Sequence, residues 1–248
     1  MSYVIDFDQE EARDPNYVLR LRGTPDGVID LSKNNSLAVN NVDCSIASTL
    51  GTGRRMKFNG VNSYIHLKHI TNLCSIKQGE DFTVSYWVFQ EGFTTSQTNS
   101  VLAYTTEPKQ WDEMFPSLSI SIDSRDLNGF MSVIYWYKNG NQFIAEGATN
   151  INNPFFANVI NFTKPYHVGL VRYNRTTKVA INGSFSSITL SCQTDLYKKD
   201  TTFFVGYAPG TGATSKYANF TIDDLCIIKG RALWTSNFTP PSSYLPDL

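Results

Sequence analysis

The sequence predicts an all-β fold, a two-sheet antiparallel jelly-roll sandwich in one domain. Short segments rich in Val, Ile, Tyr, Phe, Thr and Trp recur along the 248 residues, and this composition is typical of β-strands. The dipeptide Asn-Gly occurs four times and supplies the positive φ angles that tight hairpin turns need. No clean 3.6-residue apolar repeat is present, so nothing indicates the helices that would connect parallel strands. Strands joined by turns alone favour antiparallel pairing in two packed layers.

Ten segments are the clearest strand candidates. They are Arg54–Phe58, Ser63–Leu67, Phe82–Phe89, Ser117–Ile122, Met131–Tyr137, Gln142–Gly147, Tyr166–Tyr173, Lys178–Ile181, Phe203–Val205 and Phe220–Ile228. Asn139-Gly140 and Asn182-Gly183 follow two of these strands and predict hairpins there. The best helical candidate is Pro154–Ile160, a single turn that opens on a proline.

The third of these strands also predicts which side chains form the core. Phe82, Val84, Tyr86 and Val88 alternate along it and share one face, which we expect to be buried. Trp87 and Phe89, also two residues apart, face the other way.

Composition and charge exclude several classes of protein. Only 17% of the residues are charged, below the roughly 25% usual for soluble domains, and the net charge is −1. No run of Lys and Arg exceeds two residues, which argues against nucleic-acid binding. No apolar run approaches a membrane span, and the first residues lack the apolar region of a signal peptide. We therefore expect a chain made in the cytosol and used there or in a larger particle, with an arm (1–15), a sandwich (16–239) and a tail (240–248).

Five sequence blocks, taken in order, resemble the concanavalin A-like lectin/glucanase superfamily, in its laminin-G-like branch. The blocks are Tyr17–Arg22 with Gly27–Asn34, Met56–Leu67, Asp81–Val88, Tyr166–Arg172 with Val179–Gly183, and Phe220–Pro241. The last block resembles the closing strand and tail of versions carried by tailed bacteriophages. The resemblance implies a concanavalin A-like sandwich, but it does not decide the function, because sites are grafted onto folds.

The phage resemblance implies a non-enzymatic, lectin-like protein of the virion surface, either a receptor-binding tail fibre or a capsid decoration. We expect its partners to be other virion proteins and a host cell-surface glycan, and we expect a multi-copy assembly in which avidity strengthens weak host adhesion. Two alternatives stay open. The chain is a purely structural cementing protein without a ligand, or it is a diverged glycoside hydrolase.

Hydrolysis is the weakest of these readings. A glycosidase needs two carboxylates on one groove face, and the Glu-x-Asp-x-x-Glu arrangement of the superfamily's glucanases is absent. The acidic pairs Asp112-Glu113 and Asp223-Asp224 are adjacent in sequence, so we expect their side chains to point to opposite faces of a strand.

Three aromatic residues are the candidate ligand-binding residues, because an aromatic ring can cover the C–H face of a sugar. Trp111 lies in the expected long loop Thr105–Pro116, Trp136 lies near a hairpin tip, and Tyr207 opens the glycine-rich segment Gly206–Ser215. The alternative for each is packing or protein–protein contact.

The resemblance also implies a calcium site, because relatives often hold calcium at the sandwich edge with oxygen ligands. The corresponding residues are Asp30, Asn34 and Asp223, with Asp224 as a further candidate. The alternative is that Asp30 and Asn34 only cap a turn. The cysteines and histidines show no metal-ligand spacing, so we expect buried free thiols and a structural His167.

Overall fold

The structure is a computed structural model that describes residues 16–32, 36–68, 79–89, 98–106, 117–123, 130–139, 142–149, 165–191, 201–208 and 216–245. These residues form seventeen strands. The strands are β1 (Tyr17–Thr24), β2 (Gly27–Asp30), β3 (Ser36–Asn40), β4 (Met56–Asn59), β5 (Tyr64–Lys68), β6 (Phe82–Phe89), β7 (Thr98–Thr106), β8 (Ser117–Asp123), β9 (Phe130–Asn139), β10 (Gln142–Thr149), β11 (Tyr166–Tyr173), β12 (Thr176–Ile181), β13 (Ser184–Ser191), β14 (Thr201–Val205), β15 (Tyr207–Ala208), β16 (Lys216–Tyr217) and β17 (Asn219–Lys229). None of the described residues is helical, and none therefore belongs to a helix that could cross a membrane.

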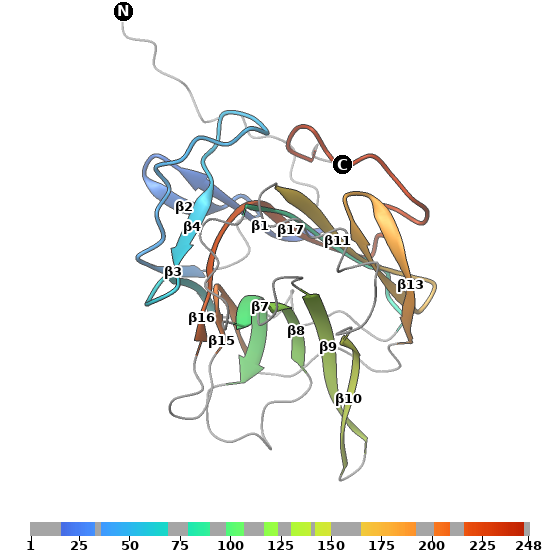
Figure 1. The fold of residues 1–248 in the computed structure, drawn as a ribbon. Coiled ribbons are helices and arrows are strands. Elements are labelled where there is room, and N and C mark those ends of the chain that lie inside the picture. The colour runs from blue at the N-terminus through green and yellow to red at the C-terminus, as the bar shows by residue number, and fades with distance from the viewer. Residues whose placement is uncertain are drawn as a thin grey trace, which may run out of the picture.

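Two antiparallel sheets stack as separate layers, with β1, β11 and β17 in one layer and β7, β8 and β9 in the other (Figure 1). The eight-stranded sheet has the order β13-β12-β11-β6-β17-β1-β2, with β4 also paired to β17. The seven-stranded sheet has the order β10-β9-β8-β7-β14-β5-β3, and β15 and β16 form a small hairpin. The predicted all-β, two-sheet antiparallel sandwich of the jelly-roll kind is confirmed.

The core lies between the two sheets and is built by alternation. Phe82, Val84, Tyr86 and Val88 of β6 are all fully buried, as predicted, and they meet Phe220 and Ile222 of β17 in one continuous cluster. The opposite sheet contributes Ile65, Leu67, Phe203 and Val205 to the same cluster. Burying each such side chain stabilises the fold by about 1.5–3 kcal/mol, so the hydrophobic effect holds the layers together.

The Asn182-Gly183 hairpin forms as predicted between β12 and β13. Asn182 has φ 49° and Gly183 has φ 80°, the conformation of a two-residue turn whose twist matches the strands. A Cβ on Gly183 would lie 1.8 Å from the carbonyl oxygen of Phe238, so the close approach also requires glycine. The strands on either side of Asn139-Gly140, β9 and β10, also pair antiparallel, although the turn itself lies outside the described residues.

Residues 231–245 contain no strand and run across the outer face of the eight-stranded sheet (Figure 1). We call this segment the strap. Near its start, the Thr83 hydroxyl donates a hydrogen bond to the carbonyl of Arg231 and accepts one from the amide of Leu233. The amide of Phe238 then donates to the carbonyl of Gly183. Leu233 and Leu245 pack on a small second cluster of Tyr17, Cys226 and Ile228. The described part of the predicted tail, 240–245, is thus folded against the sandwich.

Several expectations differ from the structure or fall outside its described part. The sequence did not single out β3, β7, β15 and β16 as strands, and Thr105 and Thr106, expected in a loop, end β7. The predicted arm 1–15 and the expected turn Pro154–Ile160 lie outside the described residues. Of the cysteines, Cys226 is buried and Cys44 is half-buried, both as free thiols.

Candidate binding site

Four aromatic side chains gather on the outer face of the seven-stranded sheet, beside the point where the chain crosses to the other sheet. They are Tyr64, Phe204, Tyr207 and Tyr217, which we call the tyrosine cluster. Alternation places the first two, because Ile65 and Val205, their neighbours in sequence, point into the core. The register of the β15–β16 hairpin places the other two directly opposite each other.

The rings of the tyrosine cluster contact one another closely. Tyr207 and Tyr217 stack with centroids 4.7 Å apart and an interplanar angle of 27°. Tyr64 lies 5.7 Å from Tyr207 and 6.3 Å from Tyr217, and Phe204 lies 5.3 Å from Tyr207. Each such pair contributes about 0.5–1.5 kcal/mol beyond its buried area. All four side chains are only half-buried, so part of this aromatic surface faces solvent.

Gly206 sets the position of Tyr207. Its φ is 77°, and a Cβ there would lie 2.2 Å from the ring of Phe58 in the core. Its carbonyl accepts a hydrogen bond from the amide of Ala218, which closes the base of the β15–β16 hairpin. The backbone at this point therefore presses on the core and turns outward, and only glycine fits both conditions.

The hydroxyl of Tyr217 keeps its proton at neutral pH. Desolvation raises its pKa above the ordinary value of 10.0, and the nearby Tyr207 and Tyr64 raise it further. A neutral phenol both donates and accepts a hydrogen bond, as a sugar hydroxyl does. The tyrosine cluster therefore combines apolar ring surface with hydrogen-bonding groups.

The three residues predicted to bind a ligand do not form one site in the described part of the chain. Tyr207 belongs to the tyrosine cluster. Trp136 lies in β9, where its Cα pairs with those of Ser117 and Ala145. Tyr207 lies on β15, which contacts β7, and β8 lies between β7 and β9, so the two residues are not on neighbouring strands. Trp111 lies outside the described residues.

Sequence reasoning missed Tyr64, Phe204 and Tyr217 as possible ligand contacts. The signal for the first two was present, since each is followed by a core residue, Ile65 or Val205, on a strand whose alternate positions point outward. Nothing local in the sequence places Tyr217 beside Tyr207; the antiparallel pairing of β15 with β16 brings them together.

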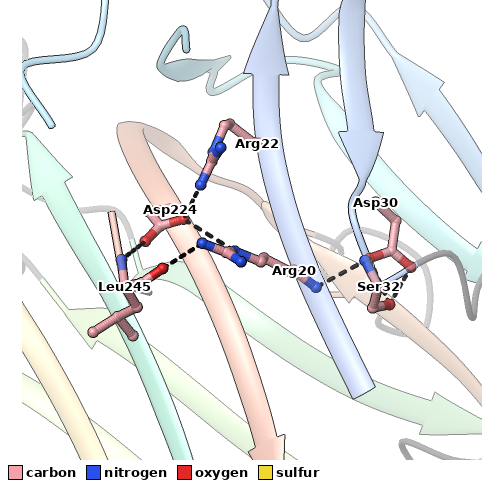
Figure 2. A network of polar contacts seen from close by, with 6 residues as sticks. All are labelled: Arg20, Arg22, Asp30, Ser32, Asp224 and Leu245. Carbon is pink, nitrogen blue, oxygen red and sulfur yellow. Dashed lines mark hydrogen bonds and ion pairs between the residues drawn. The ribbon is translucent and has the colours of Figure 1, made fainter. Parts of the chain in front are cut away.

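Asp30, one of the predicted calcium ligands, caps a turn. Its carboxylate accepts hydrogen bonds from the amide of Arg20 at 3.0 Å, from the amide of Ser32 at 3.0 Å and from the Ser32 hydroxyl at 2.7 Å. Figure 2 shows Arg20 between Asp30 and Asp224. This arrangement matches the turn-capping alternative for Asp30.

Asp224 faces two guanidinium groups rather than a site open to a cation. Its carboxylate lies 3.4 Å from Arg22 and 4.0 Å from Arg20, and it accepts a hydrogen bond from the amide of Leu245 (Figure 2). Two positive charges at this position do not fit calcium between Asp30 and Asp224. No group of three His, Cys, Asp or Glu within the described ranges is arranged to hold a metal ion. Asn34 lies outside those ranges, so the calcium prediction itself stays untested.

Asp223 and Asp224 lie on the same, outer side of β17, and the expectation of opposite faces is wrong. The register with β6 shifts between Asp223 and Cys226, and Asp224 takes a φ of 47°, so a β-bulge turns the second carboxylate outward. Both are buried, at 0% and 4% exposure, and the Ser48 hydroxyl donates to Asp223 at 2.5 Å. Desolvation raises the pKa of Asp223 to about 6. Carboxylates buried in this way cannot reach a substrate in solvent.

His167 is a structural residue, as its position in the sequence predicted. Its Nε2 lies 2.9 Å from the hydroxyl of Ser85, and the ring meets Trp87, Trp234 and Phe238 edge-on. Burial lowers its pKa from 6.5 to about 3, so the ring stays neutral.

No protein-family model matches this sequence, and no curated protein matches it. Several solved structures do resemble this chain. The receptor binding domain of botulinum neurotoxin D matches with a TM-score of 0.58 and 15% identity over 89% of this chain and 50% of that chain. A structure of botulinum neurotoxin type C, whose cell entry is described as dependent upon interaction with two ganglioside molecules, matches with a TM-score of 0.60 and 16% identity over 89% and 49%.

The binding domain of Paraclostridial Mosquitocidal Protein 1 matches with a TM-score of 0.57 and 15% identity over 88% of this chain and 50% of that chain. This chain thus spans about half the length of the structures it resembles. At such low identity the likeness shows the fold alone. It supports the β-sandwich and does not support the phage connection.

Proposed function

We propose that this chain is a non-enzymatic, lectin-like module that binds a glycan through the tyrosine cluster. The observation that carries the proposal is the half-exposed stack of Tyr207 on Tyr217, with Tyr64 and Phe204 beside it, on the outer face of a sheet. Aromatic rings cover the C–H face of a pyranose, and the phenol hydroxyls meet its hydroxyl groups.

The composition of the tyrosine cluster favours recognition over catalysis. No Asp or Glu is among the four residues, and the adjacent pair Asp223 and Asp224 is buried on the other sheet. The solved structures similar to this chain include one domain named for receptor binding and another named a binding domain, which supports a binding role by fold likeness. The ganglioside interaction belongs to the neurotoxin and suggests a host glycan as the class of ligand to test first.

The place of this module on a tailed-phage virion, as a fibre or a capsid decoration, is also part of the proposal. It rests on the resemblance of the closing segment Phe220–Pro241 to phage-borne sandwiches. Labelled antibody against this chain, imaged on intact particles by electron microscopy, tests it. Label at fibre tips or on the capsid supports the placement, and particles without label contradict it.

A glycan array with the purified chain, followed by calorimetry on the best ligand, tests the binding site. We expect Tyr207→Ala and Tyr217→Ala each to weaken binding about tenfold, which corresponds to about 1.4 kcal/mol. Ile29→Ala is the control, because Ile29 is a large apolar side chain with 39% exposure on β2 of the other sheet. Binding that is unchanged by both cluster variants contradicts the site. Silence of the array contradicts the function and favours a cementing protein.

A further inference from the structure

We propose that a pocket on the outer face of the eight-stranded sheet is a second saccharide site, for a pyranose that carries a carboxylate. The pocket has a volume of about 220 Å³ and lies between β11, β12, β13 and the strap. We call it the outer-face pocket. The lining residues that carry the argument are Tyr173, Asn174, Lys178, Phe185 and Trp234. None of them belongs to the tyrosine cluster, so the proposal does not rest on that site.

The floor and one wall of the outer-face pocket follow from strand alternation. Val168 and Leu170 of β11 point into the core, so Val171 and Tyr173 point outward. The β11–β12 register pairs Val171 with Lys178 and therefore places the lysine beside this floor. Tyr173 is 53% exposed, so its ring is available to a ligand from solvent.

The strap supplies the opposite wall and holds it in place. Trp234 stacks on Phe238 with centroids 3.9 Å apart and an interplanar angle of 3°. The amide of Phe238 is bonded to the carbonyl of Gly183, and Phe238 also meets Phe185 at 5.9 Å. Because one face of Trp234 is covered by a fixed ring, the indole is preorganised for a ligand and little entropy is lost on binding.

The chemistry of the lining fits an acidic sugar. Tyr173, Phe185 and Trp234 offer aromatic surface, while Asn174 and two threonines offer hydrogen bonds. Lys178 is the single charged residue of the lining, and it makes no ion pair with any residue in the described ranges.

The size of the outer-face pocket limits the ligand to about one ring. Its volume of about 220 Å³ is below the roughly 300–1,000 Å³ of sites for drug-sized ligands. A bare inorganic anion would leave the aromatic walls unused, and a neutral sugar would leave Lys178 without a counter-charge. A uronic or sialic acid uses both, with its C–H face on the rings and its carboxylate on the ammonium group.

Ligand-observed NMR on the full chain tests this proposal, with three probes: a glucuronic-acid-containing tetrasaccharide, N-acetylneuraminic acid and a neutral glucose tetrasaccharide. We expect at least one acidic probe to bind more tightly than the neutral one. Lys178→Gln should weaken it about fivefold or more, and raised salt should weaken it in the wild type. Arg175→Gln is the matched control, since Arg175 is an exposed cation of the same hairpin that does not line the pocket. Thermal melting checks that both variants fold.

Three results would overturn the proposal: no binding of either acidic probe, equal binding of acidic and neutral probes, or equal effects of Lys178→Gln and Arg175→Gln. Tyr207→Ala separates the two sites. If it leaves the acidic probe bound while Lys178→Gln does not, the outer-face pocket stands even where the tyrosine cluster fails. If Lys178→Gln has no effect while Tyr207→Ala abolishes binding of the acidic probe, the tyrosine cluster is its binding site and the outer-face pocket is not.

Discussion

The guanidinium carbon of Arg22 lies 3.5 Å from the centre of the Tyr244 ring. This contact joins β1, near the start of the sandwich, to the end of the strap. Arg22 also pairs with Asp224 of β17, and the amide of Leu245 bonds that same carboxylate (Figure 2). One buried acid therefore holds the first strand, the closing strand and the strap together.

Removing the Tyr244 ring should loosen the strap. We expect Tyr244→Ala to lower the free energy of unfolding by about 2 kcal/mol, because it deletes a cation–π contact and half-buried ring surface. Chemical denaturation measures the loss, and hydrogen exchange should show faster exchange at Phe238 and Leu245. Tyr244→Phe keeps the ring and serves as control. Equal stability of the alanine variant and the wild type would contradict the role of the contact.

Asp223 should make the protein less stable as pH rises from about 4 to 6. Burial raises the pKa of its carboxyl from 3.8 to about 6, so the folded state holds the proton more tightly than the unfolded chain does. Ionisation at pH 7 then costs about 3 kcal/mol at most. Asp223→Asn removes this cost and keeps an acceptor for Ser48.

Urea unfolding at pH 4 and pH 7 checks this prediction. The asparagine variant should be more stable than the wild type at pH 7, and the two should converge at pH 4. Asp26→Asn is the control, because Asp26 is exposed in the turn after β1. A variant that is less stable than the wild type at pH 7 would contradict the raised pKa.

His167 should make the protein less stable as the pH falls, opposite to the effect of Asp223. Burial lowers its pKa from 6.5 to about 3. Between these two pH values the unfolded chain therefore binds a proton that the folded state does not bind. The stability that comes from the neutral ring is present above pH 6.5 and is lost as the pH falls toward 3. NMR titration of the His167 ring protons should show no midpoint above pH 4. A midpoint near 6.5 would show that the ring is accessible to water.

Gly206 should be intolerant of any side chain. Gly206→Ala places a Cβ 2.2 Å from the Phe58 ring at a φ of 77°, so we expect a loss of about 2 kcal/mol or more in unfolding free energy. Gly230→Ala is the matched control, because Gly230 has nearly the same φ, of 74°, but the nearest atom to its Cβ position is 3.9 Å away. Equal losses in the two variants, measured by denaturation, would mean that the contact with Phe58 is unimportant.

Much of the fold could be predicted because its signals are local. Alternation in Phe82–Phe89 identified the core face, and the Asn182-Gly183 turn was identified from its two residues. β7 was missed because it is rich in Thr, Ser and Asn and shows little apolar alternation. Tyr207 was identified as a candidate ligand contact from its place after a glycine, whereas its partner Tyr64 comes from β5, far away in sequence.

The sequence by itself determined the strand content, the hairpin turns and the inward or outward side of regular strands, since a period of two residues is a property of neighbouring positions. Only the tertiary structure decided which outward side chains meet, as Tyr64 and Tyr207 do, because sheet order depends on pairing between distant strands. It also decided that Asp223 and Asp224 share one side of β17. A bulge breaks the two-residue period there, and contacts with Arg20, Arg22 and Leu245 stabilise it.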